Sequence, residues 1–136
     1  MFLDASVIVA NLLEEAEAVA IREALLNENE LVTSPLAMFE ASTRLAAVKR
    51  FSIDDGYRVV QGFLEDANIR VTAIDAEVGR IAHRCATLYH HSTGHRARLN
   101  MGDCFAYASA RAAGARLAYK GDDFVHTDIE GQRFGS

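Results

Sequence analysis

Five acidic side chains stand where apolar neighbours make a charge costly. They are Asp4, in the opening run MFLDASVIVA, Glu40 and Asp103, within segments of helical periodicity, and Asp122 and Asp123, directly after a later apolar run. Carboxylates held close together repel one another and take up protons unless a cation lies between them. Oxygen ligands with few histidines nearby favour a hard ion, Mg2+ or Mn2+. Because such an ion lowers the pKa of a water molecule, the group would suit phosphodiester hydrolysis.

Three of these acids also have a structural interpretation. Asp4 could cap the next helix, a role that Ser6 could share. Glu40 falls on the apolar stripe of its helix and could pair there with Arg44. Asp103 could interact with the dipole in the first turn of its own helix. The stripe that places Glu40 on the apolar face consists of Leu36, Phe39, Glu40, Thr43 and Ala47.

The segments that must position these acids alternate between short apolar runs and amphipathic stretches. We expect strands at 1–3, 31–33, 69–73 and 116–119, and a short fifth strand beginning within 127–129. Helical patterns run up to residue 13 and cover 15–26, 35–49, 52–64, 75–88 and 101–113. This alternation predicts an α/β fold with a mostly parallel sheet of four to five strands, covered by helices on both faces. Ligands bind such sheets at the carboxyl ends of the strands, near the reversal of strand order.

Length and composition restrict the class of protein. The chain has 136 residues, half of them hydrophobic, which predicts one soluble domain over residues 1–136. Cys85 and Cys104 form neither a disulfide framework nor a CxxC pair, so we expect a cytoplasmic location. The opening run resembles neither a signal peptide nor a membrane span. The net charge of −5 argues against a broad basic surface, although acids gathered around a metal ion would contribute to that count.

The segment HRCATLYHHSTGHRARLN, at 83–100, gathers four of the five histidines with three arginines. It could be a solvated loop without a function. It could instead be a rim beside Asp103 in which Arg96 and Arg98 contact the phosphates of a nucleic-acid substrate. A zinc site formed by its last three histidines is a third interpretation, but no cysteine is near enough to complete a familiar ligand set. Lys120, just ahead of the acidic turn, is a further candidate for phosphate contact.

Four motifs follow one another over nearly the whole chain: MFLDASVIVA, SPLAMFEASTRLA, LNMGDCFAYASA and LAYKGDDFVHTDI. In these motifs the sequence resembles the PIN-domain ribonucleases, in particular the VapC toxins of bacterial toxin-antitoxin modules. The resemblance implies a three-layer α/β/α fold and a Mg2+- or Mn2+-dependent endoribonuclease that inhibits translation and growth. It also implies a homodimer and inhibition by a small VapB-like antitoxin.

The resemblance implies roles for individual residues as well. Asp4 matches the first metal-binding Asp of the family, Glu40 its helical Glu, and Asp103 the acid of its GD helix. Ser6 matches the small hydroxyl residue two positions after the first Asp, which would orient a carboxylate or a metal-bound water.

The turn KGDDF offers two candidates for the fourth acid of the site. We slightly favour Asp122 as the metal-facing one, with Asp123 bonding the turn, and we interpret Asp128 as structural. The acids would hold one or two ions, and a metal-activated water would attack the RNA phosphorus in line and displace a ribose oxygen. In the family, this reaction leaves a 5′-phosphate.

Two other functions fit parts of the pattern. A receiver-type, phosphorylation-dependent signalling module also combines a doubly wound sheet with Mg2+ among acids. It would use Asp75 as phosphoacceptor and Lys120 as its lysine, but it leaves Glu40 and Asp103 without a role. The second alternative is a PIN-fold protein that has lost catalysis and serves only as a binding partner, and the intact acids argue against it.

Overall fold

Five short parallel strands form a sheet at the centre of the molecule, in the order β3-β2-β1-β4-β5. The structure is a computed structural model that describes residues 1–135. The strands are β1 at Phe2–Leu3, β2 at Leu31–Thr33, β3 at Ile69–Val71, β4 at Leu117–Lys120 and β5 at Gly131–Phe134. All four pairings are parallel, as expected where helices connect the strands, and β4 and β5 are parallel as well although only a loop joins them.

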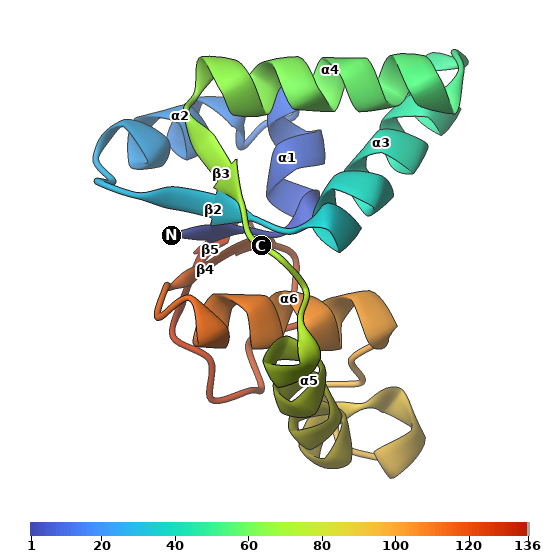
Figure 1. Cartoon of the computed structure of the whole chain (residues 1–136), viewed down its shortest axis with the longest axis vertical. Helices are drawn as coiled ribbons and strands as arrows, with labels where there is room; N and C mark the ends of the chain where they lie inside the picture. Colours follow the sequence, from blue (N-terminus) through green and yellow to red (C-terminus); the bar gives the residue numbers. More distant parts are fainter. Residues whose placement is uncertain (136) are drawn as a thin grey trace.

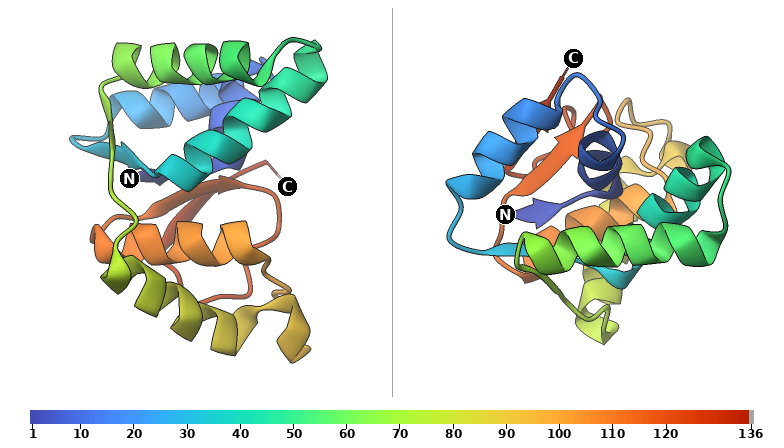
Figure 2. Two further views of the ribbon diagram at one scale, coloured as in Figure 1. Left: turned by 45° about the vertical axis from the view of Figure 1, so that its right-hand side comes forward. Right: turned by 90° about the horizontal axis from the view of Figure 1, so that it is seen from above.

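Helices cover both faces of this sheet (Figure 1). Helices α1 to α4 lie on one side and α5 and α6 on the other, and Figure 2 shows the resulting three layers from two further directions. No helix within residues 1–135 is both long and apolar enough to cross a membrane. The helices are α1 at Ala5–Leu12, α2 at Ala18–Leu26, α3 at Pro35–Lys49, α4 at Ile53–Asp66, α5 at Ala76–Tyr89 and α6 at Met101–Ala112, with a 3₁₀ turn, η1, at His91–Thr93.

Polar caps set where most of the helices begin. In each case the side chain of the N-cap residue accepts a hydrogen bond from a backbone N–H of the first turn. Pro35 directly follows one of these caps, at a position where its missing N–H costs nothing. Asp4 directly follows β1 and Ser34 directly follows β2, so α1 and α3 both begin at the same edge of the sheet. The capping residues are Asp4, Ser34, Ser52, Asp75 and Asn100.

The inner strands β1, β2 and β4 are buried on both faces, which explains why they are nearly continuous apolar runs in the sequence, whereas the edge strands β3 and β5 are mostly exposed. Successive side chains point to opposite faces. One set belongs to the core with α1 to α4: Leu3, Leu31, Ile69 and Ala118. The other set belongs to the core with α5 and α6: Phe2, Val32, Leu117 and Tyr119.

Strand order reverses beside β1, because β2 and β3 lie on one side of it and β4 and β5 on the other. Since β1 and β4 are parallel neighbours, their carboxyl ends meet at one edge. Asp4 follows β1 directly, and the turn at 121–124 follows β4. The predicted α/β/α fold with a parallel sheet of up to five strands is therefore confirmed.

Two local predictions were wrong. The fifth strand begins at Gly131 rather than within 127–129, because residues 122–127 close hydrogen-bonded turns of their own. In α3, Phe39 and Ala47 of the predicted apolar stripe are exposed. Much of the true inner face consists of small residues, which carry little hydrophobic signal. The predicted stripe was therefore drawn through the larger Phe39, which is exposed. The buried positions of α3 are Ala37, Met38, Ala41, Ser42, Leu45 and Ala46.

Candidate active site

Asp4 lies at the end of β1 and caps α1. Its Oδ2 accepts hydrogen bonds from the Ser6 backbone N–H, at 3.1 Å, and from the Ser6 hydroxyl. The Ser6 Oγ in turn accepts a hydrogen bond from the Lys120 backbone N–H, at 3.0 Å. Ser6 therefore ties Asp4 to the end of β4 across the strand reversal. Burial raises the pKa of the Asp4 carboxyl, the bonds from Ser6 lower it, and the charge of Asp123 raises it.

Glu40 approaches the same edge from α3. It is half-buried and faces the first turn of α6, where a Cβ at Gly102 would lie 2.2 Å from Glu40 Oε1. Any side chain at position 102 would have to displace the Glu40 carboxylate, so glycine is part of the site. Sequence reasoning missed this role, although the GD pair carried the signal. Burial raises the pKa of Glu40, the charge of Asp4 raises it further, and Arg44 lowers it.

Asp103 opens α6 in a capping box. The Asn100 N–H donates to Asp103 Oδ2 at 3.0 Å, and the Asp103 N–H donates to Asn100 Oδ1 at 2.8 Å, so a first-turn structural role is present. Burial raises the pKa of Asp103 to about 7; the bond from Asn100 opposes this rise, and the charges of Asp123, Asp4 and Glu40 add to it. The charges of Asp4, Glu40 and Asp123 therefore all act on the Asp103 carboxyl.

The acidic turn after β4 presents its two carboxylates to different neighbours. Both residues are exposed, and Asp122 is bonded to the guanidinium of Arg133 in β5. The charge of Asp123, in contrast, raises the pKa of both Asp4 and Asp103. We therefore infer that Asp123, rather than Asp122, which the sequence slightly favoured, is the fourth acid. We call Asp4, Glu40, Asp103 and Asp123 the acidic site.

The acidic site suits a divalent cation by its chemistry. It offers only carboxylate oxygens, the ligands that Mg2+ and Mn2+ prefer, and the raised pKa values of three of its members show that it resists carrying full negative charge alone. As placed, no three His, Cys, Asp or Glu side chains within residues 1–135 already form a metal-binding cluster. Holding a cation would therefore require these carboxylates to turn toward one another.

The raised pKa of Asp103 predicts that metal-free protein loses stability as the pH rises. Between the ordinary value of 3.8 and about 7, the folded state holds a proton that the unfolded state has released. Unfolding therefore becomes easier through this window as the pH increases. Because Asp103 is only part-buried, the discounted effect is on the order of 1–2 kcal/mol, or a few degrees in the unfolding midpoint. Thermal unfolding in metal-free buffer from about pH 4 to 8 measures it.

Two variants serve as controls for this pH dependence. Residue 103 cannot titrate in Asp103→Asn, so this variant should lose the part of the slope that Asp103 contributes and keep the part that comes from Asp4 and Glu40. Asp75→Asn removes a capping acid from α5 and should retain the slope. A wild-type midpoint that climbs steadily over the same pH range would contradict the assignment.

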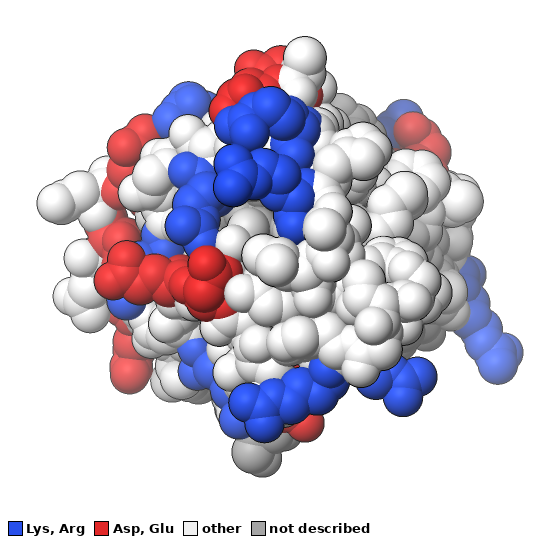
Figure 3. Space-filling model, turned by 90° about the horizontal axis from the view of Figure 1, so that it is seen from below, with Lys and Arg blue, Asp and Glu red and all other residues white. Residues whose placement is uncertain are grey.

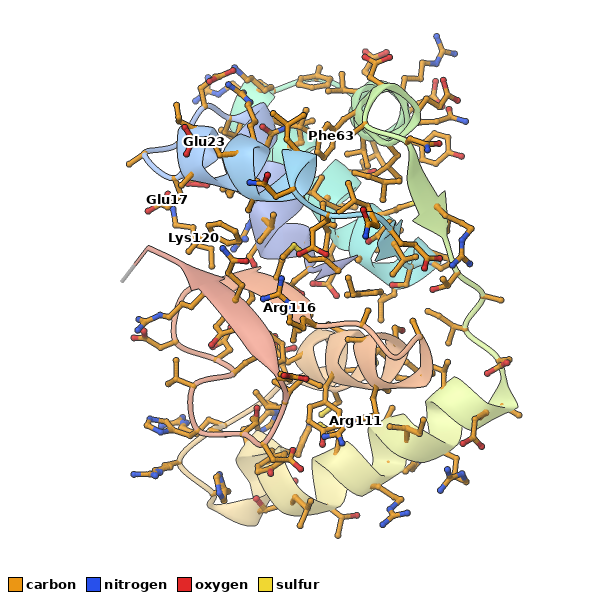
Figure 4. The ribbon with its side chains drawn as sticks, turned by 90° about the vertical axis from the view of Figure 1, so that its left-hand side faces the viewer. Glu17, Glu23, Phe63, Arg111, Arg116 and Lys120 are labelled. Atoms are coloured by element: carbon orange, nitrogen blue, oxygen red, sulfur yellow. The ribbon has the colours of Figure 1, made fainter. Side chains whose placement is uncertain are left out.

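The basic residues predicted to contact RNA differ in their availability. Arg96 and Arg98 are exposed and take part in none of the ion pairs formed within residues 1–135. Lys120 Nζ, however, lies 3.1 Å from Glu15 Oε2 and 3.0 Å from Glu17 Oε2. Figure 4 shows Lys120 and Glu17 next to one another. The charge of Lys120 is thus neutralised, and the structure does not support its predicted phosphate contact.

Two alternative interpretations find no support in the geometry. The rings of His90 and His91 stack with centroids 4.0 Å apart, and His95 Nδ1 accepts a backbone N–H at 3.0 Å, so these histidines serve local contacts rather than converging on a zinc ion. Asp75 caps α5 through a hydrogen bond of 3.0 Å. Because Lys120 is bound to glutamates in the other helical layer, the pairing that a receiver-type module requires is not formed.

A wide apolar hollow on the described part of the chain lies away from the acidic site. It is a groove of about 1080 Å³ beside α3, α4 and β3, and its lining includes Met38, Phe39, Ile53, Tyr57 and Val71. The hollow at the acidic site is small and nearly filled by the side chains that line it. The candidate active site is therefore identified by its clustered carboxylates and not by the size of a cavity.

Comparisons with known proteins agree with this arrangement. The chain matches the PIN domain family over residues 1–130. It is 37% identical over 130 residues to Ribonuclease VapC42 of Mycobacterium tuberculosis, covering 95% of this chain and 96% of that one. Its fold is similar to that of Mycobacterium tuberculosis VapC20, a sarcin-ricin loop cleaving toxin (TM-score 0.71, 16% identity, 97% and 98% coverage). It is also similar to Rickettsia felis VapBC2 bound to promoter DNA (TM-score 0.73, 15% identity, 98% coverage of both).

Proposed function

Because the chain belongs to the PIN-domain family and to its VapC ribonucleases, we propose that it is a Mg2+- or Mn2+-dependent endoribonuclease toxin of a type II toxin-antitoxin system. The observation that carries the metal dependence is the acidic site, in which burial and three neighbouring acids raise the pKa of Asp103 to about 7. By cutting RNA, the protein would inhibit translation and growth.

Each member of the acidic site has a role in this proposal. Asp4, Glu40, Asp103 and Asp123 would hold the cation, which when bound lowers the pKa of a water molecule and offsets charge at the phosphate. Ser6 orients the Asp4 carboxylate through the bonds to its Oδ2. The Asp103 carboxyl would release its proton as the cation binds, so cation affinity should fall at acidic pH.

We assign phosphate contacts to basic side chains that no carboxylate neutralises. Of the Lys and Arg side chains within residues 1–135, more than half are in ion pairs, and Arg44, Arg96 and Arg98 are among those that are not. Arg44 is one turn from Glu40 on α3, and Arg98 is two residues before the cap of α6, so they flank the acidic site from two elements. On the face in Figure 3, formed by the layer of α5 and α6, basic side chains gather in bands. Such contacts position a nucleic acid without reading its sequence.

We further propose a VapB-like antitoxin as the inhibitor and a homodimer as the free form. The apolar groove beside α3 and α4 fits an antitoxin segment, because Phe39 and Ile53 are 62% and 58% exposed there and β3 is an edge strand open to pairing. The mass of the free protein in solution, measured by light scattering, should be twice that of one chain.

Phe39→Asp should weaken binding of the antitoxin encoded with this protein by about 30-fold or more, since it places a charge in the apolar groove. Val48→Asp is the matched control, because Val48 is 58% exposed on the same helix but does not line the groove. Calorimetric titration measures both affinities. Equal losses for the two variants, or none for Phe39→Asp, would contradict the assignment of the groove.

Cleavage of a labelled, structured RNA in Mg2+, in Mn2+ and in EDTA tests the proposed activity. Cutting that requires a divalent ion is the expected result. Cutting in EDTA would contradict the metal dependence. No cutting of any RNA, together with no calorimetric Mn2+ binding, would instead favour the PIN-fold protein that only binds a partner.

A further inference from the structure

The loop after β4 has no regular secondary structure, yet it carries Asp123, whose charge acts on both Asp4 and Asp103. We propose that Tyr107 and Asp128 form a clamp that fastens this loop and positions Asp123 in the acidic site. They are positioning residues, since neither belongs to the acidic site itself. The inference rests on the proposed function, because it concerns cation binding by that site.

Asp128 is held by three side chains from two helices. Its Oδ1 accepts a hydrogen bond from the Tyr107 hydroxyl at 2.6 Å, and its backbone N–H donates to the Tyr89 hydroxyl at 3.2 Å. Arg111 Nη2 lies 3.3 Å from Asp128 Oδ2 and donates to the Tyr107 hydroxyl at 2.7 Å. Figure 4 shows Arg111 between α6 and α5. These contacts fasten the loop to the α5–α6 layer.

The clamp and the acidic site share helix α6. Asp103 and Tyr107 are four residues apart, so they lie on the same face of this helix, one turn from each other. One belongs to the acidic site and the other holds Asp128. A displacement of Asp128 from Tyr107 would therefore also displace Asp123 from Asp103.

The chain between Asp123 and Asp128 is short and internally bonded, so it can transmit this positioning. Two backbone hydrogen bonds, of 3.3 and 3.1 Å, close turns within residues 122–127. Phe124 is buried and packs edge-on against Tyr119 of β4, with ring centroids 5.1 Å apart. The loop thus has one anchor on β4 and a second on α6, with Asp123 directly beside the first.

The Tyr107 hydroxyl donates its proton to Asp128 and accepts a hydrogen bond from Arg111. Tyr107 is only 6% exposed, and a buried donor left without an acceptor is costly. The bond from Tyr107, with help from Arg111, keeps the pKa of Asp128 below its usual range, so the acceptor is a carboxylate and the bond is strong. Tyr107→Phe keeps the packed ring and removes only this hydroxyl, which makes it a clean test.

The test is the affinity for Mn2+, measured by calorimetry on the full chain. Tyr107→Phe and Asp128→Asn should each weaken Mn2+ binding by about 10-fold, the loss typical of residues that orient metal ligands. In an Asp123→Asn background the same changes should have little further effect, because no carboxylate remains to be positioned. Thr87→Val, which removes an exposed hydroxyl from α5, is the control with unchanged affinity.

The possible outcomes separate the clamp from the proposed function. If the wild type binds Mn2+ and both clamp variants bind it equally well, the clamp is overturned. If Tyr107→Phe weakens binding equally with and without Asp123, it acts through general stability, and the clamp is again overturned. If the wild type binds no Mn2+, the metal-dependent function itself fails, and the clamp fails with it.

Discussion

Asp4→Asn and Asp103→Asn are each expected to lower the rate of RNA cleavage by at least about 100-fold, since even residues that only orient metal ligands cost 10- to 100-fold when lost. Each substitution removes one negative charge from the acidic site while keeping the size of the side chain. Cleavage of a labelled RNA at saturating Mn2+ measures the loss, and calorimetric Mn2+ titration should show a parallel fall in affinity.

Both variants should keep their fold, which is what makes the expected loss informative. Asn caps helices about as well as Asp, so α1 and α6 retain their N-caps or first-turn bonds. Since burial raises the pKa of both carboxyls, a neutral amide removes an unfavourable charge. The unfolding midpoint of metal-free Asp103→Asn near neutral pH should therefore equal or exceed that of the wild type.

The matched control is Asp75→Asn. Asp75 also follows a strand and caps a helix, by accepting a hydrogen bond from the Val78 N–H, but it lies near the last turn of α6, whereas Asp103 is in the first turn. Its substitution should leave cleavage unchanged. A loss as large as that of Asp4→Asn would mean that capping, rather than a charge in the acidic site, explains the importance of Asp4.

Signals that are local in the sequence predicted most of this fold. The caps at Ser34 and Asp75 and the apolar runs at 31–33 and 117–120 each place an element through interactions within a few residues. Parallel pairing then follows from the alternation of strands and helices. The position of Asp4 at the strand reversal could be anticipated for the same reason, because it follows the first apolar run directly.

Features that depend on distant residues could not be predicted in this way. Lys120 is paired with Glu15 and Glu17, which precede it by more than a hundred residues, so its sequence neighbourhood gave no sign that its charge is neutralised. The role of Gly102 depends on the approach of Glu40 from another helix. Likewise, the partner of Asp122 lies in β5, a strand whose start the pattern placed too early.

The choice between the two carboxylates of the acidic turn leads to a second large effect. Asp123→Asn should reduce cleavage by about 100-fold, like the other substitutions in the acidic site, whereas Asp122→Asn should change it by less than about threefold. The reason is that Asp123 is the carboxylate whose charge reaches Asp4 and Asp103. Asp122 pairs with Arg133 at the surface, and exposed ion pairs contribute little to stability.

The two variants form a matched pair, because they make the same substitution one residue apart in one turn. Cleavage rates and Mn2+ affinities should both separate them, and their unfolding midpoints should remain close. The opposite order, with Asp122→Asn the more damaging, would mean that the carboxylate leaves Arg133 when a cation binds. The acidic turn would then rearrange on binding, and the inference that Tyr107 and Asp128 position Asp123 for the cation would be wrong.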